Sequence, residues 1–358
     1  GVWNDLPTTV TRTYIVEYEP ITTVVVNDDD AATKTTSVTL NLEFESADDA
    51  GTPTVRFRNG TGTWSDWTTY STSLPWTLDA TQGTKTVNVE FKDAYGLVYA
   101  ASDTIYLDST APTGSVAIEG GADWTNSSAV SLDLTYDDTH SNVASMRFRI
   151  PGEAWSDWLP AAPSAAFTLT SGEGIRSVEA EFRDDAGNVS PTASDDIGID
   201  LTAPTVELVV ADGEAHVGTR HVPLTLDATD TGSGVESLRF RVNGGSWIDW
   251  LPFESPTTCD VGRDESSKII EVQVRDRAGN VSDDTADPVS LDITEPEITH
   301  FRINAGAPYV LPDEPLGLEL SAMDNPGGSG ATDFSISFDR GSTWSAWHAI
   351  FGGWLANV

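Results

Sequence analysis

The chain has 358 residues, 39% of them hydrophobic, and a formal net charge of −37 from 56 acidic and 19 basic side chains. Its length predicts two to four domains. The acidic balance excludes nucleic acid and anionic membrane surfaces as partners, because both require a basic footprint. Two compatible interpretations remain, a solvated acidic surface suited to a salty environment and the binding of divalent cations.

Few features of the chain bear on its compartment. No apolar run is long enough to span a membrane, and no signal peptide is visible. We expect either that a leader has been removed or that the chain is an excerpt of a longer protein. Cys259 is the only cysteine, which excludes an intrachain disulfide. A secreted protein without disulfides depends on packing or on metals. We predict that Cys259 is a small apolar residue within a strand.

A repeat of 92 residues organises the sequence. Pro20, Pro112, Pro204 and Pro296 are evenly spaced, and the last three follow an acidic residue by four positions. A tandem array of this kind predicts one domain per repeat. The predicted organisation is an N-terminal extension over 1–19, complete domains over 20–111, 112–203 and 204–295, and an incomplete fourth domain over 296–358.

The residues before the first repeat match the end of a domain. "VTRTYIVEYEP" at 10–20 falls in the frame of "SDTIYLDSTAP" at 102–112, which predicts a last strand at 8–17 whose own domain is absent. The fourth repeat has the opposite defect, since it ends at Val358 before its last two strands. Either the chain is an excerpt of a longer repeat protein, or the first strand of one copy completes the last domain of the next in a head-to-tail filament.

Within each repeat, apolar and polar residues alternate with a period of two, and clusters of Gly, Asp, Asn and Pro separate the alternating runs. This pattern is typical of half-buried strands, and no segment has helical periodicity. The sequence therefore predicts an all-β fold, a tandem array of β-sandwich domains with seven-stranded immunoglobulin-like topology. In the third repeat the predicted strands include 205–210, 222–228, 238–242, 269–275 and 287–293.

Several motifs recur in a fixed order. Units begin with "D-x-T-A-P", carry "SGV", "RFR" and "W-x-D-W", and close with "V-x-V-R-D-x-A-G-N-V-S". In these motifs the chain resembles the tandem immunoglobulin-like repeats of large bacterial and archaeal cell-surface proteins, over 20–295 and in part over 296–358. The resemblance implies an extracellular spacer, adhesin, S-layer or filament component, and it names no ligand.

A pair of tryptophans three residues apart occurs once in every repeat, and we interpret the pairs as structural. A tight hairpin in the third repeat would place Trp247 opposite Phe240 in the core. Trp250 would then lie outside, beside Arg239 and Arg241, where a cation–π stack is expected. Sugar stacking and C-mannosylation of the Trp-x-x-Trp spacing are the alternatives. The pairs are Trp64 and Trp67, Trp155 and Trp158, Trp247 and Trp250, and Trp344 and Trp347.

Carboxylates recur at three places that an immunoglobulin-like sandwich brings to one pole: the start of the first strand, the loop after the second, and the turn before the last. Oxygen ligands gathered at a domain junction are typical of Ca²⁺ sites. Turn capping by the same aspartates is the alternative. The predicted ligands are Asp108, Asp138 and Asp184 in the second repeat and Asp200, Asp230 and Asp276 in the third; the first repeat offers Glu17, Asp48 or Asp49, and Asp93.

Other candidate sites are weaker. Four Asn-x-Ser/Thr sequons, at Asn59, Asn126, Asn188 and Asn280, are possible glycosylation sites. The five histidines are scattered without metal-ligand spacing, and no nucleophile or phosphate-binding motif is present. We therefore predict no catalytic residue and no enzyme.

These observations favour a structural extracellular protein, an array that forms or extends a surface filament, layer or stalk. It would associate with itself head-to-tail or adjoin further repeats of a longer chain. The alternative is an adhesin or virion fibre module that binds glycans or another cell, which exposed tryptophans in a groove would favour.

Overall fold

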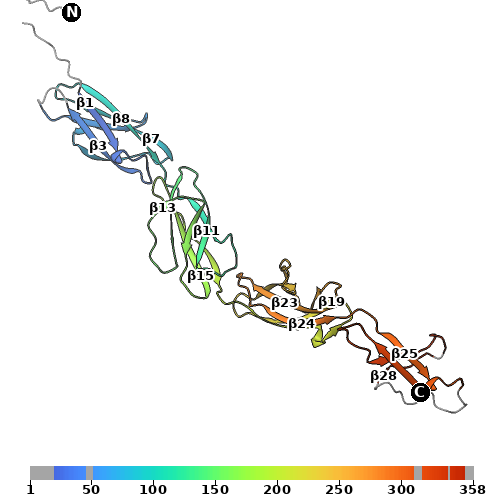
Figure 1. Ribbon diagram of the computed structural model, residues 1–358. Helices are drawn as coiled ribbons and strands as arrows, with labels where there is room; N and C mark the ends of the chain where they lie inside the picture. Colours follow the sequence, from blue (N-terminus) through green and yellow to red (C-terminus); the bar gives the residue numbers. More distant parts are fainter. Residues whose placement is uncertain (1–19, 46–50, 310–316, 338, 351–358) are drawn as a thin grey trace, which may run out of the picture. The chain divides into compact units, whose positions relative to one another are not determined.

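The computed structural model describes residues 20–45, 51–309, 317–337 and 339–350 (Figure 1). Apart from three single 3₁₀ turns at Asn27–Asp29, Ala211–Gly213 and Asn304–Gly306, its regular structure is β-strand, which confirms the predicted all-β fold. The chain forms two compact units, and each site described below lies within one of them. The predicted extension over 1–19, with its strand at 8–17, lies outside the described residues.

The first repeat is a sandwich of two sheets. One has the strand order β1-β3-β6 and the other β2-β8-β7-β4-β5, and all pairs are antiparallel except β2 with β8. With the short strand β2 left out of the count, the seven main strands are, in chain order, β1, β3, β4, β5, β6, β7 and β8. The first, second and fifth main strands share one sheet, and the third, fourth, sixth and seventh share the other. This is an immunoglobulin-like arrangement. The strands are β1 (Ile21–Val26), β2 (Ala32–Thr33), β3 (Ser37–Glu45), β4 (Thr54–Asn59), β5 (Thr68–Thr69), β6 (Ser73–Thr77), β7 (Gly83–Lys92) and β8 (Val98–Leu107).

The second repeat has the same two sheets, β14-β11-β9 and β10-β16-β15-β12-β13. Its short strand β10 again pairs in parallel with the last strand, β16. The strands are β9 (Thr113–Ile118), β10 (Trp124–Thr125), β11 (Ala129–Asp137), β12 (Val143–Arg149), β13 (Leu159–Pro160), β14 (Ser164–Thr168), β15 (Gly174–Asp184) and β16 (Ala193–Ile199).

The third repeat forms the sheets β17-β19-β22 and β18-β24-β23-β20-β21. The strand predicted over 205–210 is β17, and the short parallel strand β18 was not predicted because two residues carry no alternation. The strands are β17 (Thr205–Val210), β18 (His216–Val217), β19 (His221–Thr229), β20 (Val235–Val242), β21 (Leu251–Pro252), β22 (Thr257–Asp260), β23 (Ser267–Asp276) and β24 (Thr285–Leu291).

Alternate residues of each strand fill the core between the two sheets. In β23, Ile270, Val272 and Val274 are completely buried, while the residues between them face outward. Cys259 lies in β22, is also completely buried, and packs in the same cluster. The prediction that it is a small apolar residue of a strand is confirmed.

The described part of the fourth repeat differs from the others. It pairs β25 with β26 and β27 with β28, in two small sheets. Every residue of β25 is exposed, including Ile298 and Phe301, which are 63% and 51% exposed. The strands are β25 (Glu297–Ile303), β26 (Leu318–Met323), β27 (Asp333–Phe334) and β28 (His348–Ala349).

Candidate metal centre

Asp108 is the first residue after β8, and it links two repeats. Its main-chain N–H donates to the carbonyl of Thr33 in the first repeat at 2.9 Å. Its carboxylate accepts the Ser141 hydroxyl of the second repeat at 2.6 Å and the main-chain N–H of Thr110 at 2.9 Å. Asp108 has no solvent exposure. A charged side chain is buried this completely only where several donors replace its water.

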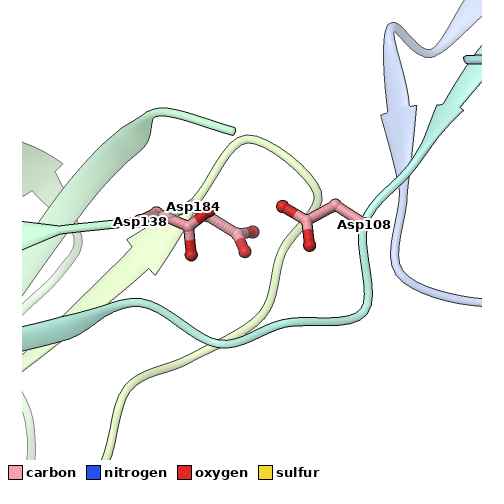
Figure 2. A group of neighbouring side chains, drawn as sticks. All are labelled: Asp108, Asp138 and Asp184. Carbon is pink, nitrogen blue, oxygen red and sulfur yellow. The ribbon is translucent and has the colours of Figure 1, made fainter. Parts of the chain in front are cut away.

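Two more carboxylates meet Asp108. Asp138 follows β11, and Asp184 ends β15, so both come from the same pole of the second repeat. One carboxylate oxygen of each of the three residues lies within 4.8 Å of those of the other two. Figure 2 shows the three side chains turned toward one another. The three residues that the sequence pattern predicted to converge do so.

The cluster contains an acceptor that the protein does not satisfy. Asp138 uses Oδ1 to accept the main-chain N–H groups of His140 and Ser141, both at 2.8 Å. Its Oδ2 is buried and has no hydrogen-bond partner. Among the described residues, no lysine or arginine forms a salt bridge with any member of the cluster. Carboxylates this close repel one another. A bound cation would offset this repulsion and would give the unpaired Oδ2 of Asp138 a partner.

The third repeat repeats the arrangement with Asp200, Asp230 and Asp276, whose oxygens also lie within 4.8 Å of one another. Asp230 accepts the N–H groups of Gly232 and Gly234 through Oδ2, and its Oδ1 is buried without a partner. Two independent stretches of sequence therefore leave the same kind of oxygen unsatisfied at the same place.

Hydrogen bonds keep Asp200 ionised. Burial raises the pKa of its carboxyl, but hydrogen bonds from Ser233 and Thr202 outweigh burial and hold the pKa below the usual value. Gly232 lies against this carboxylate, and a Cβ on Gly232 would overlap it. The first glycine of "TGSGV", Gly232, therefore leaves space for the Asp200 carboxylate. A role in turn formation alone would not require that space.

Two asparagines that were predicted as glycosylation sites are part of these clusters. The Nδ2 of Asn188 donates to the Asp108 carbonyl at 2.9 Å and to the Asp184 carboxylate at 2.7 Å. Asn280 makes the same two bonds, to Asp200 at 2.9 Å and Asp276 at 2.8 Å. The asparagine of the "AGNVS" turn thus positions the aspartate four residues before it. The same asparagine also bonds to the main chain at the start of the repeat. Glycosylation of the four sequons stays a prediction.

The fourth repeat begins with part of the same arrangement. Asp292 accepts the main-chain N–H of Ser329 at 2.6 Å and its hydroxyl at 2.7 Å, and its Oδ1 is buried without a partner. Asp324 occupies the place of Asp230 and accepts the N–H of Gly330 at 2.7 Å. A third carboxylate from a turn before the last strand is not found among the residues that the structure describes in this repeat.

In the first repeat only Asp93 of the predicted set lies among the described residues. Asp93 is buried at the start of the β7–β8 turn, where it accepts the N–H groups of Tyr95 and Leu97. Glu17, Asp48 and Asp49 lie outside the described residues.

The tryptophan pairs do not enter the core, so the prediction for Trp247 was wrong. The tight turn of the predicted hairpin forms at Asn243 and Gly244, since the Gly245 N–H donates to the Val242 carbonyl at 3.0 Å. One extra residue follows, and Ile248 rather than Trp247 bonds to the Phe240 carbonyl, at 3.1 Å. A shift of one residue moves every side chain to the opposite face. Trp247 therefore lies outside with Trp250.

In each of the first three repeats the pair forms a ladder in which cations and rings alternate. In the third repeat Arg239 lies between the two rings, 4.8 Å from Trp247 and 4.5 Å from Trp250. Arg241 covers the first ring at 4.5 Å, and Arg275 of β23 covers the second at 4.7 Å. The other two ladders are Arg58, Trp64, Arg56, Trp67 and Lys92 in the first repeat, and Arg149, Trp155, Arg147, Trp158 and Arg183 in the second.

The stacked cations determine whether the tryptophan rings are available to ligands. Because cations stack on the tryptophans of the first three repeats, these rings are not free platforms for sugars. The ladders instead attach the irregular segment that carries the tryptophans to the neighbouring strand, which is β7, β15 or β23 in the three repeats. The cation that β7, β15 or β23 supplies was not predicted from the sequence, although "FKD", "FRD" and "VRD" place it at the same position in every complete repeat.

Comparisons with known proteins are limited to fold. No protein-family model matches the sequence, and no curated protein does. Of the solved structures, the tetra-tandem repeat in the extending region of a large adhesion protein is similar at 18% identity and a TM-score of 0.29, covering 95% of this chain and 91% of that one. The fibronectin(III)-like modules of Clostridium thermocellum CbhA are similar at 17% identity and a TM-score of 0.37, covering 49% and 93%.

A third similar structure contains three N-terminal domains of the Highly Immunogenic Outer Capsid protein of bacteriophage RB49, at 12% identity and a TM-score of 0.38, covering 77% of this chain and 100% of that one. The chain is a tandem array of immunoglobulin-like β-sandwich repeats, and this assignment rests on its own strand order.

No helix in the described residues is long and apolar enough to cross a membrane.

Proposed function

We propose that this chain is a structural array of immunoglobulin-like repeats that forms or extends an extracellular filament, layer or stalk, and that Ca²⁺ stiffens the joints between its repeats. The observation that carries the proposal is the repeated cluster of three aspartates, with one buried and unsatisfied carboxylate oxygen in each.

The donor set suits a hard cation. Ca²⁺ binds six to eight oxygen ligands and accepts flexible geometry, whereas Zn²⁺ prefers nitrogen and sulfur. Asp108, Asp138 and Asp184 would hold one ion, Asp200, Asp230 and Asp276 another, and water would complete each shell. Such an ion supplies positive charge where three carboxylates meet, and the protein supplies their orientation.

The position of the ion would give it a mechanical effect. The Asp108 main chain is bonded to the first repeat, and its carboxylate faces the second. An ion held by that carboxylate and by two aspartates of the second repeat would add a restraint between consecutive repeats. The net charge of −37 suits a salty environment, because dissolved cations screen the repulsion between surface charges.

Electron microscopy of the purified chain, with Ca²⁺ and after EDTA, tests the proposal. Extended particles or head-to-tail filaments that bend or dissociate in EDTA are expected. Isolated particles with the same distribution of bend angles in both conditions would contradict the proposed joint and the proposed assembly.

A glycan-binding adhesin is the second candidate. The observation that favours it is the exposure of Trp344 and Trp347, which are 64% and 74% exposed, unlike the tryptophans of the other repeats. A glycan array compared with the Trp347→Ala variant tests it. Binding lost in the variant would support it, and no binding by the parent chain would remove it.

A further inference from the structure

The four Asn-x-Ser/Thr sequons differ in how the fold uses the amide that would carry a sugar. N-glycosylation replaces one of the two hydrogens on Nδ2 with a glycan, which is bulky and hydrophilic and therefore needs a surface position. If both hydrogens already donate within the fold, the modification removes a hydrogen bond and leaves an acceptor unsatisfied. The contacts of each amide therefore show which sequon is open to modification in the folded chain.

The amides of Asn188 and Asn280 are fully used. Each Nδ2 donates to a main-chain carbonyl and to a carboxylate of its aspartate cluster, and both side chains are half-buried. A glycan on either Nδ2 would break one of these bonds at a place where charged groups are already buried. The two "AGNVS" turns are therefore closed to the modification while the repeats are folded.

The amide of Asn59 links the two sheets of the first repeat. Asn59 is the last residue of β4, and its Nδ2 donates to the carbonyl of Thr77 in β6 at 2.9 Å. Its Oδ1 accepts the Nε1–H of Trp76 at 2.7 Å, and the side chain is half-buried. Because β4 and β6 belong to different sheets, a glycan on this amide would disturb a contact that joins them.

Asn126 differs from the other three sequon asparagines. It follows β10 in the short segment that leads to β11, and it alone of the four is exposed. Among the residues that the structure describes, none forms a hydrogen bond with the Asn126 side chain. Both hydrogens of its Nδ2 are therefore available, and a glycan there would cost the fold no hydrogen bond.

The surroundings of Asn126 place it at the start of the third repeat. Thr125, the residue before it, accepts the main-chain N–H of Asp200 at 3.0 Å. A Cβ on Gly279, in the turn between β23 and β24, would lie 3.7 Å from the Asn126 Nδ2. In the first repeat Lys34 has the same place after β2, and its Nζ donates to the Gly187 carbonyl at 3.0 Å. Asn126 makes no such bond, so a glycan would lie beside this joint without displacing a contact.

We infer that Asn126 is the sequon of this chain that accepts an N-linked glycan in the folded state. The Nδ2 of Asn126 forms a bond to C1 of the first sugar, and the bond from C1 to the phosphate oxygen of a lipid-linked sugar donor breaks. Nδ2 loses one proton, and the phosphate leaves with the bonding electrons. The inference goes beyond the proposed function, because it assigns a covalent modification to a residue outside the aspartate clusters.

The test uses the folded, unglycosylated full chain, an oligosaccharyltransferase that recognises Asn-x-Ser/Thr, and a lipid-linked oligosaccharide. The mass of the intact chain measures incorporation, and peptide mapping locates it. Asn126→Gln and Ser128→Ala destroy the sequon by two different changes. Thr61→Ala destroys the sequon of Asn59 at an exposed residue and is the matched control. Short peptides centred on each of the four sequons measure acceptance outside the fold.

We expect one glycan on each folded chain, attached to Asn126. It should be lost in Asn126→Gln and in Ser128→Ala and should be unchanged in Thr61→Ala. All four peptides should be accepted, because their amides no longer bond within the fold. A folded chain that is modified at another sequon, or not modified at Asn126, would overturn the inference. Acceptance of the Asn126 peptide alone would also overturn it, because the local sequence rather than the fold would then determine the site.

Discussion

Ser233 donates its main-chain N–H to the carboxylate of Asp200 at 2.6 Å, although 33 residues separate them in the sequence. The Asp200 main chain donates in turn to the carbonyl of Thr125 in the preceding repeat, at 3.0 Å. Ser329 and Asp292 repeat the first bond at 2.6 Å, one repeat further on. One aspartate at the start of a repeat therefore bonds to the repeat before it and to the repeat that it begins.

Substitution of Gly232 tests how closely this carboxylate is enclosed. A Cβ in Gly232→Ala would overlap the carboxyl of Asp200, so the side chain must move away from Ser233. We expect a loss of about 1–3 kcal/mol in the free energy of unfolding of the third repeat, because a buried charge loses a donor. Urea denaturation measures it. Gly218→Ala, whose Cβ would meet only a carbonyl at 3.9 Å, is the control and should change stability far less.

The lowered pKa of Asp200 predicts a loss of stability in acid. The folded state favours the ionised form, so the contribution is present above the unfolded pKa of about 3.9 and disappears as the pH falls through the lower folded pKa. The urea midpoint should therefore fall below about pH 4. Asp200→Asn should be less stable at pH 7 and less sensitive to pH in this window. An equally steep acid dependence in the variant would show that other groups cause it.

The position of the acidic clusters could be predicted from the sequence, but their contacts could not. The 92-residue period and the strand order place Asp200, Asp230 and Asp276 at one pole, since these follow from patterns that the chain repeats. The bond from Ser233 and the space left by Gly232 depend on the three-dimensional path of a loop, which alternation does not encode. The prediction for Trp247 failed for a similar reason, because one extra residue after a correctly predicted turn reverses the face.

Replacement of Arg239 tests the ladder. This residue contacts both rings of the third repeat, at 4.8 and 4.5 Å. Arg239→Met keeps much of the aliphatic stem and removes the charge together with the hydrogen bonds that Arg239 donates to Gln273, and we expect a loss of about 1–2 kcal/mol in the free energy of unfolding. The exposed Arg277 of the same repeat provides the control, Arg277→Met. Equal effects of the two substitutions would mean that the stacking contributes nothing to stability.

Cys259 reports on the integrity of the third repeat. The thiol is completely buried, and burial, with a smaller contribution from the neighbouring charge of Asp260, raises its pKa to about 12. We expect no reaction with a thiol reagent at pH 8 in the folded chain and one equivalent in concentrated urea. Rapid reaction of the folded chain would show that β22 is not enclosed as described. The same assay resolves the unfolding of this repeat from that of the others.

The aspartate clusters are proposed to bind Ca²⁺, and the stoichiometry of binding is the most direct test. Equilibrium dialysis should find that Asp138→Asn and Asp230→Asn each remove one bound ion and that the double variant removes two. Asp249→Asn, an exposed aspartate between the tryptophans, should remove none. If the parent chain binds no Ca²⁺ at millimolar concentrations, or if all three substitutions reduce binding equally, the clusters are not metal sites and Ca²⁺ does not stiffen the joints.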